Sequence, residues 1–225
     1  MIRAAVFDFD GVILESTSVK DRAVFDLFPQ ATLQQRKRVL GVHRSNPGIE
    51  RRQRIKLLLA RGLGRQPVDG EVDRLLERFS ALVHEEILLC PEVPGIRGFL
   101  ESLKGISCYV VSAAPQNEVR EAASARGFSG YFADILGMPP SKPENLAEIG
   151  RRENVSMHEV LFTGDKISDY LAAQKAGVMF AGRRTMENPT RFPGKTVVID
   201  DFIDGAEKIR RFFLKNPKES TTLSD

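Results

Sequence analysis

The stretch IRAAVFDFDG, residues 2–11, joins a short apolar run to two carboxylates and a glycine. Its β-branched and aromatic side chains are typical of a buried parallel strand. Similar runs recur at residues 106–112, 160–163, 178–181 and 196–199. Helical patterns lie between these runs, and Gly177 is placed to end one of the helices. The alternation predicts an α/β fold, with a Rossmann-like core built on a mostly parallel sheet.

The alternation is interrupted once, between residues 16 and 91, where only helical patterns occur. The clearest of them cover residues 51–60 and 72–88. This segment predicts a small all-helical cap domain inserted after the first strand. We therefore expect three parts: a core domain of residues 1–15 and 92–215, a cap domain of residues 16–91, and a frayed polar tail of residues 216–225.

Bulk composition favours a cytoplasmic globular protein. Of the 225 residues 42% are apolar and 28% are charged, and the formal net charge is +3. Acidic residues within the first ten positions argue against a secretory signal, and no apolar run reaches the ~18 residues that span a bilayer. Cys90 and Cys108 match no metal or redox spacing, as expected of reduced thiols in the cytoplasm. We expect no membrane partner.

Positive charge is concentrated in residues 16–66, where 12 Lys and Arg residues face three acids and leave an excess of +9. Two interpretations stay open: a solvated helical face, or a segment that handles an anion. Nucleic acid is not expected as a partner, because few aromatic side chains are interleaved there for base stacking.

Asp8 and Asp10 stand two residues apart at the end of the first predicted strand. Ligands of open α/β sheets bind at that edge. Two neighbouring carboxylates repel, so one would take up a proton unless a cation lies between them. The pair therefore indicates a metal site or an acid–base pair, with two solvated acids at a strand end as the plain alternative.

Two further segments contain groups that can bind an anion. Ser112 and Ala113 follow a predicted strand and precede a helix expected to start near Gln116, so a hydroxyl and free amides could bind an anion there. Lys142 precedes Pro143 at a predicted helix start and could present a point charge to a phosphoryl group. The plain alternatives are an ordinary helix entry and a surface lysine.

Two more acids, Asp165 and Asp169, follow the predicted strand at residues 160–163. They would reach the same edge of the sheet as Asp8. Carboxylates with no histidine or cysteine nearby suit Mg²⁺, which prefers oxygen ligands. The alternative is an aspartate that caps the next helix.

Taken together, these four segments resemble in order and spacing the four motifs of the haloacid dehalogenase superfamily. FDFDGVILES, residues 7–16, looks like the opening of its phosphoglycolate phosphatase and β-phosphoglucomutase group. The resemblance covers residues 2–16 and about 92–200, and the position of the cap. It departs at Ala113, where asparagine is common, and at Lys166, where a small residue is common.

The resemblance implies a Mg²⁺-dependent phosphatase that forms an aspartyl-phosphate on Asp8. Asp10 would protonate the leaving oxygen and then take a proton from the attacking water. The Asp8 carboxylate, the Asp10 backbone carbonyl and Asp165 would hold the metal.

The remaining motif residues would support this reaction. By the same resemblance, Ser112 and the Ala113 amide would bind phosphoryl oxygens. Lys142 would stabilise the phosphoryl charge and keep Asp8 ionised, while Asp169 would orient Lys142 or a metal-bound water.

The resemblance also places a turn-rich loop of the cap, residues 41–48, close to the substrate. Arg44, and Arg51 on the next helix, could then hold a second anionic group, because guanidinium binds phosphate or carboxylate in a fork. The expected partner is a small phosphate ester such as a sugar phosphate. The alternative is that both arginines only solvate the cap surface.

Three other activities stay open at this point. A phosphomutase would use the same residues and return the phosphate to its substrate. A metal-free dehalogenase would use Asp8 but has no leaving oxygen for Asp10 to protonate. A non-catalytic protein that binds a phosphorylated ligand is the third, since fold alone does not decide function. The sequence does not give the oligomeric state.

Overall fold

The protein contains one six-stranded parallel sheet in the order β3-β2-β1-β4-β5-β6. The structure is a computed structural model that describes residues 1–46, 49–185 and 191–214. The strands are β1 (Ala4–Phe7), β2 (Ser107–Pro115), β3 (Asp134–Met138), β4 (Val160–Gly164), β5 (Met179–Arg183) and β6 (Val197–Ile199). The expected α/β class with a Rossmann-like, mostly parallel sheet is confirmed.

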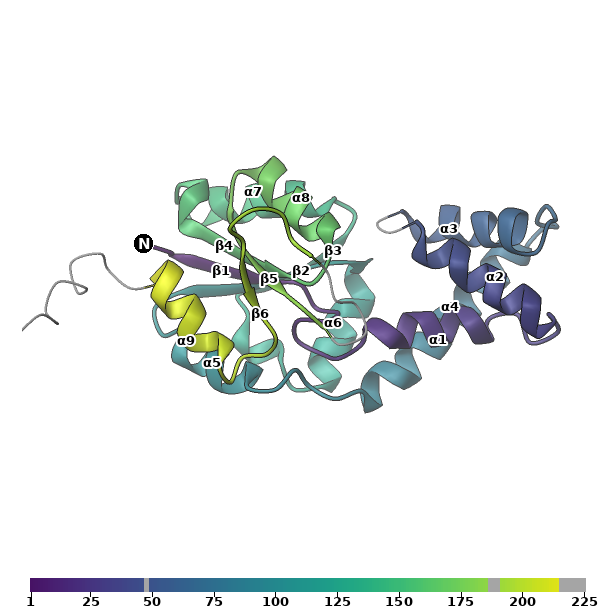
Figure 1. The fold of residues 1–225 in the computed structure, drawn as a ribbon, viewed down its shortest axis with the longest axis horizontal. Helices are drawn as coiled ribbons and strands as arrows, with labels where there is room; N and C mark the ends of the chain where they lie inside the picture. Colours follow the sequence, from purple (N-terminus) through teal and green to yellow (C-terminus); the bar gives the residue numbers. More distant parts are fainter. Residues whose placement is uncertain (47–48, 186–190, 215–225) are drawn as a thin grey trace, which may run out of the picture. The chain divides into compact units, whose positions relative to one another are not determined.

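Helices cover both faces of this sheet (Figure 1). In the core these are α5 (Ile96–Ser102), α6 (Gln116–Ala125), α7 (Lys142–Arg152), α8 (Ile167–Ala176) and α9 (Gly205–Ile209), with the short turns η2 (Ser129–Tyr131), η3 (Met157–Glu159) and η4 (Arg210–Leu214). Helices α7 and α8 lie on one face, and α5, α6 and α9 lie on the other (Figure 1). Gly177 ends α8 in the left-handed conformation with φ of 74°, as its position in the sequence predicts.

Each face of the sheet has its own apolar layer, because successive side chains of a strand point to opposite sides. On the α7 and α8 face, Val6 and Phe162 belong to a buried cluster with Leu146 and Ile149 of α7. On the other face Phe7 meets three rings, those of Phe99, Phe132 and Phe202, at centroid distances of 6.2, 6.3 and 6.2 Å. β1 is therefore buried on both sides, which accounts for its continuous apolar run.

Strand β3 is absent from the sequence prediction. It is an edge strand of five residues, and only Ile135 and Leu136 supply large buried side chains. The run is too short for periodicity to separate a strand from a loop. Strand β2 also extends beyond its predicted end to Pro115, with a shift in its pairing to β3 after Val111.

The chain order of the strands places a topological switch point at the carboxyl ends of β1 and β4. From β1 the chain moves outward to β2 and β3, then returns to the other side of β1 for β4, β5 and β6. The direction of winding thus reverses between β1 and β4, the kind of point where open α/β sheets bind ligands.

Residues Ser16–Cys90 form a second compact unit, separate from the one made by Met1–Glu15 and Pro91–Asp225. The helical unit, as we call Ser16–Cys90, contains α1 (Thr17–Asp26), α2 (Leu33–Arg44), α3 (Arg51–Leu57), the π-helical turn η1 (Leu58–Gly62) and α4 (Glu71–Leu89). None of the helices in the described ranges is long and apolar enough to cross a membrane.

The interpretation of residues 41–48 as a loop is wrong over its first half. Residues 41–44 are the last turn of α2, which a capping box at Thr32 begins and which ends after Arg44. Pro47 and Gly48 lie outside the described residues, and so does the expected tail at 216–225. The helical hydrogen bonding continues through this stretch, since the Ser45 amide donates to the Gly41 carbonyl at 3.1 Å.

Candidate active site

Three strand ends deliver the motif side chains to one edge of the sheet. Phe7 of β1 is in register with Val110 of β2 and with Thr163 of β4. Asp8 therefore begins where the strand pairing ends, and its amide still donates to the Thr163 carbonyl at 2.8 Å. Asp165 follows the last residue of β4 directly.

A tight turn after Asp8 positions Asp10. The carbonyl of Phe9 accepts hydrogen bonds from the amides of Ile13 and Leu14 at 3.0 and 3.2 Å. Gly11 adopts φ of +73°, which glycine reaches without the penalty of a side chain, and its amide donates to the Leu14 carbonyl at 2.8 Å. The turn leaves both Asp8 and Asp10 only 4% exposed.

Lys142 joins two of the aspartates. Its Nζ lies 2.7 Å from Oδ2 of Asp8 and 2.7 Å from Oδ1 of Asp169. Lys142 is the first residue of α7, where Ser141 and Glu144 form a capping box and Pro143 occupies the first turn. The prediction of a lysine at a helix start is confirmed, and the alternative of a surface lysine is wrong because only 11% of the side chain is exposed.

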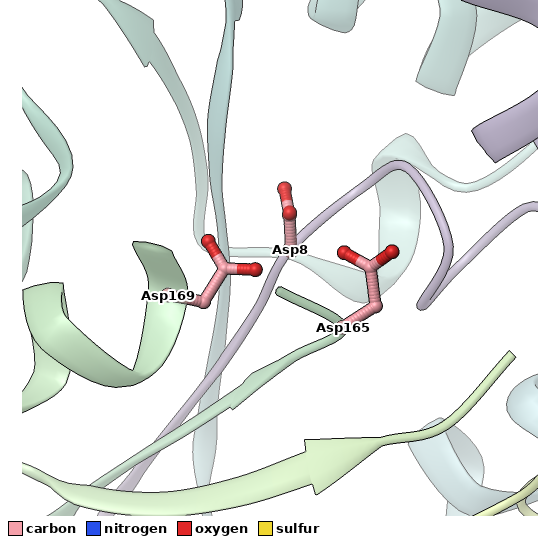
Figure 2. Close-up of side chains that lie close together, drawn as sticks. All are labelled: Asp8, Asp165 and Asp169. Carbon is pink, nitrogen blue, oxygen red and sulfur yellow. The ribbon is translucent and has the colours of Figure 1, made fainter. Parts of the chain in front are cut away.

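The aspartates form a compact buried cluster. Asp8, Asp165 and Asp169 each offer a carboxylate oxygen, and these oxygens lie within 4.8 Å of one another. Figure 2 shows the three carboxyl groups gathered around a common space, Asp8 from the end of β1, Asp165 from the end of β4 and Asp169 from α8. Asp165 is fully buried.

Burial and crowding raise the pKa values of two cluster members. Desolvation raises the pKa of Asp8 to about 6, opposed by the charge of Lys142 and reinforced by Asp169. Desolvation raises the pKa of Asp165 to about 7, opposed by Lys166 and reinforced by Asp169. For Lys142 burial disfavours the charge, but Asp169 and Asp8 outweigh it and raise its pKa. The charge of Lys142 therefore does not fully offset the effects of burial and of the neighbouring carboxylates on the pKa of Asp8.

A divalent cation fits this donor set. Carboxylate oxygens are hard ligands of the kind that Mg²⁺ prefers, and a cation among them would keep Asp8 and Asp165 ionised. Asp169 is less suited to direct ligation, because Oδ1 binds Lys142 and Oδ2 accepts the Lys166 amide at 3.0 Å. Its contacts are those of a residue that orients Lys142.

A second lysine brings further positive charge to the cluster. Nζ of Lys166 lies 3.9 Å from Oδ1 of Asp165, and 34% of the lysine side chain is exposed. Burial opposes its charge, but Asp165 and Asp8 outweigh burial and raise the pKa of Lys166. Two ammonium groups thus accompany the four aspartates of the motifs, which leaves a net negative site.

Ser112 lies at the same edge and is 1% exposed. Its Oγ accepts a hydrogen bond from the Ala114 amide at 3.1 Å, which leaves the hydroxyl hydrogen to donate elsewhere. Helix α6 begins at Gln116 and has Pro115 at its N-cap. Ser112 is therefore no helix cap, and Ala113 beside it is exposed.

The two arginines predicted to bind substrate, Arg44 and Arg51, belong to the helical unit. Arg44 donates from Nε to Oδ2 of Asp21 at 2.7 Å, and 64% of its side chain is exposed. Arg51 donates to Oγ of Ser80 at 2.9 Å and lies over the ring of Phe79, 5.0 Å from its centroid. Their role toward a substrate stays a prediction.

Arg183 belongs to the surroundings of the site, and sequence reasoning missed it. It ends β5, is 3% exposed, and donates to the Gly11 carbonyl and to both carboxylate oxygens of Glu15. The doublet Arg183-Arg184 reads as surface charge in the sequence. The available signal was its position at the end of a strand, β5, whose neighbour β4 is followed by the motif residue Asp165.

Comparison with known proteins identifies one family and a set of relatives. A family model described as haloacid dehalogenase-like hydrolase matches residues 2–177. The phosphoglycolate phosphatase of Pseudomonas fluorescens (strain Pf0-1) is 27% identical over 219 residues, which cover 88% of this chain and 76% of that protein. The phosphoglycolate phosphatase of Pasteurella multocida is 28% identical over 191 residues, covering 78% of this chain and 83% of that protein.

Solved structures agree in fold. A predicted phosphoglycolate phosphatase from Haemophilus somnus has a TM-score of 0.71 at 20% identity, covering 92% of this chain and 97% of that one. CbbY from Rhodobacter sphaeroides, solved with xylulose-1,5-bisphosphate, has a TM-score of 0.70 at 20% identity. The match covers 92% of this chain and 99% of that one. At this identity the likeness concerns the fold alone.

Gly164 allows Asp169 to approach β4, so Gly164→Ala should impair the site. A Cβ there would collide with Cβ of Asp169 and lie 2.9 Å from its Oδ2. Displacing Asp169 displaces Lys142, and a shift of about 1 Å in a reactive group costs about 10²-fold in rate. We expect that loss in phosphate release, with retained circular dichroism. Gly98→Ala is the control, since no atom lies within 4 Å of the added Cβ. Wild-type rates for Gly164→Ala would contradict this packing argument.

Proposed function

This chain belongs to the haloacid dehalogenase-like hydrolase family, and we propose that it is a Mg²⁺-dependent phosphatase that hydrolyses a small phosphate ester through an aspartyl-phosphate on Asp8. Membership of this family, together with relatives that are phosphoglycolate phosphatases, makes it a phosphoric monoester hydrolase. The observation that carries the mechanism is Lys142, buried between Asp8 and Asp169 beside Asp165.

Asp8 is the nucleophile in this mechanism. Its Oδ1 accepts the Phe9 amide at 2.7 Å and its Oδ2 binds Lys142, so the carboxylate has a fixed direction. A carboxylate oxygen attacks phosphorus, a bond from Asp8 to phosphorus forms, and the bond from phosphorus to the ester oxygen breaks. Lys142 offsets the negative charge of the phosphoryl group, which otherwise repels an anionic nucleophile.

Asp10 moves the proton in both halves of the reaction. It gives a proton to the departing ester oxygen, so the alcohol leaves neutral. It then takes a proton from the water that attacks the aspartyl-phosphate, which releases phosphate and restores the Asp8 carboxylate. A non-catalytic binding protein has no need of this second acid, and a dehalogenase has no leaving oxygen for it to protonate.

Mg²⁺ would be held by the carboxylates of Asp8 and Asp165 and by the Asp10 backbone carbonyl. When bound, it supplies positive charge that offsets the phosphoryl oxygens. Ser112 donates its hydroxyl hydrogen, and Ala113 its amide, to phosphoryl oxygens. Asp169 keeps Lys142 in place from the other side.

The substrate in this proposal is a small ester with a second anionic group. The helical unit contributes the basic excess of residues 16–66, with Arg44 and Arg51 as candidate contacts. Relatives named phosphoglycolate phosphatase support this class, since phosphoglycolate carries a carboxylate beside its phosphate. Guanidinium groups bind such an anion in a fork.

Replacing the nucleophile should abolish turnover without unfolding the protein. We expect Asp8→Asn to lose about 10⁴-fold or more of phosphate release, because the isosteric amide cannot form the covalent intermediate. Rapid quench of the wild type, followed by mass spectrometry, should find a phosphoryl adduct on the peptide that contains Asp8. Asp69→Asn, at an exposed position, is the charge-matched control. Near-normal turnover by Asp8→Asn would remove Asp8 from the mechanism.

Metal removal should stop the reaction reversibly. Activity should disappear with a chelator and return with Mg²⁺. Asp165→Asn should need at least about 10-fold more Mg²⁺ than wild type for half-maximal activity, the usual order for a disturbed metal site. The Mg²⁺ concentration that raises the melting temperature should likewise be higher for Asp165→Asn than for wild type, since ligand binding stabilises the folded state. Full activity in excess chelator would exclude the metal from the mechanism.

The helical unit should decide between esters that differ in the leaving group. Arg44→Ala should lower kcat/KM about 10-fold or more for an ester with a second anion, by loss of a charged hydrogen bond. A small aryl phosphate has no such group, so its hydrolysis should change little. Lys56→Ala, which removes an exposed positive charge from the same unit, is the control. Equal rates for Arg44→Ala and wild type on both esters would leave Arg44 as surface charge.

A further inference from the structure

We propose that Arg183 is a positioning residue, which holds the turn that carries Asp10 in the geometry required to protonate the leaving group. The proposal rests on the phosphatase mechanism above and deepens it. Arg183 belongs to none of the four motifs, and it reaches the site through the backbone of the turn.

The guanidinium of Arg183 makes four hydrogen bonds to three residues, which belong to two segments of the chain. Nη1 donates to the Gly11 carbonyl at 2.8 Å and to Oε2 of Glu15 at 2.9 Å, and Nη2 donates to Oε1 of Glu15 at 2.5 Å. Nε donates to the Asp200 carbonyl at 2.9 Å. One side chain thus ties the turn after β1 to the residue that follows β6.

The turn at residues 9–14 is held by its own hydrogen bonds and, at its far end, by residues 92 and 93. Its amides donate to the carbonyls of Phe9 and Leu14, the Val93 amide donates to the Ile13 carbonyl at 3.0 Å, and Leu14 forms a bridge to Glu92. The Gly11 carbonyl, directly after Asp10, points outward from this pattern and accepts from Arg183. The guanidinium therefore fixes the peptide next to the acid, and the fork to Glu15 fixes the end of the same turn.

Burial makes this arrangement specific for arginine. The Arg183 side chain is 4% exposed, and an unpaired charge at that depth is costly, so the Glu15 carboxylate and the two carbonyls must all remain in place. A lysine would keep the charge but offers no planar fork, so it cannot bond Gly11, Glu15 and Asp200 together.

A purely structural arginine and a positioning arginine predict different kinetics. If Arg183 only stabilised the fold, its loss would lower activity on every ester by the same factor. If it places Asp10, its loss should weaken the step in which Asp10 acts. Esters with poor leaving groups need that proton, and nitrophenyl phosphate needs it far less.

The test compares Arg183→Met and Arg183→Lys with wild type on an alkyl phosphate and on nitrophenyl phosphate. We expect kcat on the alkyl phosphate to fall at least about 10-fold more than kcat on nitrophenyl phosphate. Arg184→Met is the matched control, since Arg184 is the next residue, is 54% exposed and pairs with the Asp200 side chain. It should change neither rate. Glu15→Gln, which keeps the arginine and removes one charge, serves if Arg183→Met does not fold.

A double-mutant cycle with Asp10→Asn ties the effect to the acid. Once Asp10 can no longer donate a proton, adding Arg183→Met should produce almost no further selectivity between the two esters, because both changes remove one step. Equal losses on both esters, or selectivity that adds fully in the double variant, would overturn the positioning role.

Hydrogen exchange provides a readout that is independent of turnover. In Arg183→Met the amides of Gly11 and Leu14 should exchange at least about 10-fold faster than in wild type, because their turn has lost the hydrogen bond to the Gly11 carbonyl and the fork to Glu15. Arg184→Met should leave them unchanged. Unchanged exchange in Arg183→Met would overturn the proposal. If wild-type protein released no phosphate from any ester, the phosphatase mechanism would fail, whereas the exchange experiment would still decide whether Arg183 orders the turn.

Discussion

Repulsion among the buried aspartates at the carboxyl ends of β1 and β4 constrains the rest of the site. Asp8, Asp165 and Asp169 are buried and place oxygens within 4.8 Å of one another. Carboxylates so arranged either take up protons or gather cations. Burial raises the pKa of Asp8 to about 6 and that of Asp165 to about 7, and the neighbouring carboxylates add to this even with Lys142 in place, so the site retains a demand for positive charge that a divalent cation would meet.

The topology creates this crowding and also limits it. Because β1 and β4 are parallel neighbours in register, any side chain that follows one strand lies beside the side chain that follows the other. The chain brings Lys142 to the same edge from α7 on one face, with Pro143 and a capping box to fix the helix start. The charge of the buried aspartates is thus partly offset by a lysine far from them in sequence, and only the complete sheet brings these residues together.

Sequence predicted the parts of this site that follow a recognisable strand or begin a helix. Asp8 and Asp165 follow the apolar runs of β1 and β4, which mark where those strands end, and Lys142 precedes Pro143 at a helix start. Arg183 could not be found in this way, since its partners are backbone carbonyls and Glu15, about 170 residues away in the chain, and carbonyls leave no mark in a sequence. The edge strand β3 was missed because its run is too short to show a period, and the last turn of α2 was missed because Gly41 in it is typical of a loop.

The recognition proposed for the helical unit differs in its physical character from the chemistry proposed at the sheet edge. Arg44 is exposed and already paired with Asp21, and an exposed ion pair contributes little free energy because water screens it. Exchanging the Asp21 carboxylate for a substrate anion would therefore cost little, and it would bring to Arg44 a ligand of the same charge and shape. Lys142, in contrast, pairs with the buried carboxylates of Asp8 and Asp169, and breaking a buried ion pair costs far more free energy. In the proposed function, the rigid charges at the sheet edge would serve bond breaking, and the exchangeable charge of Arg44 would serve to distinguish one ester from another.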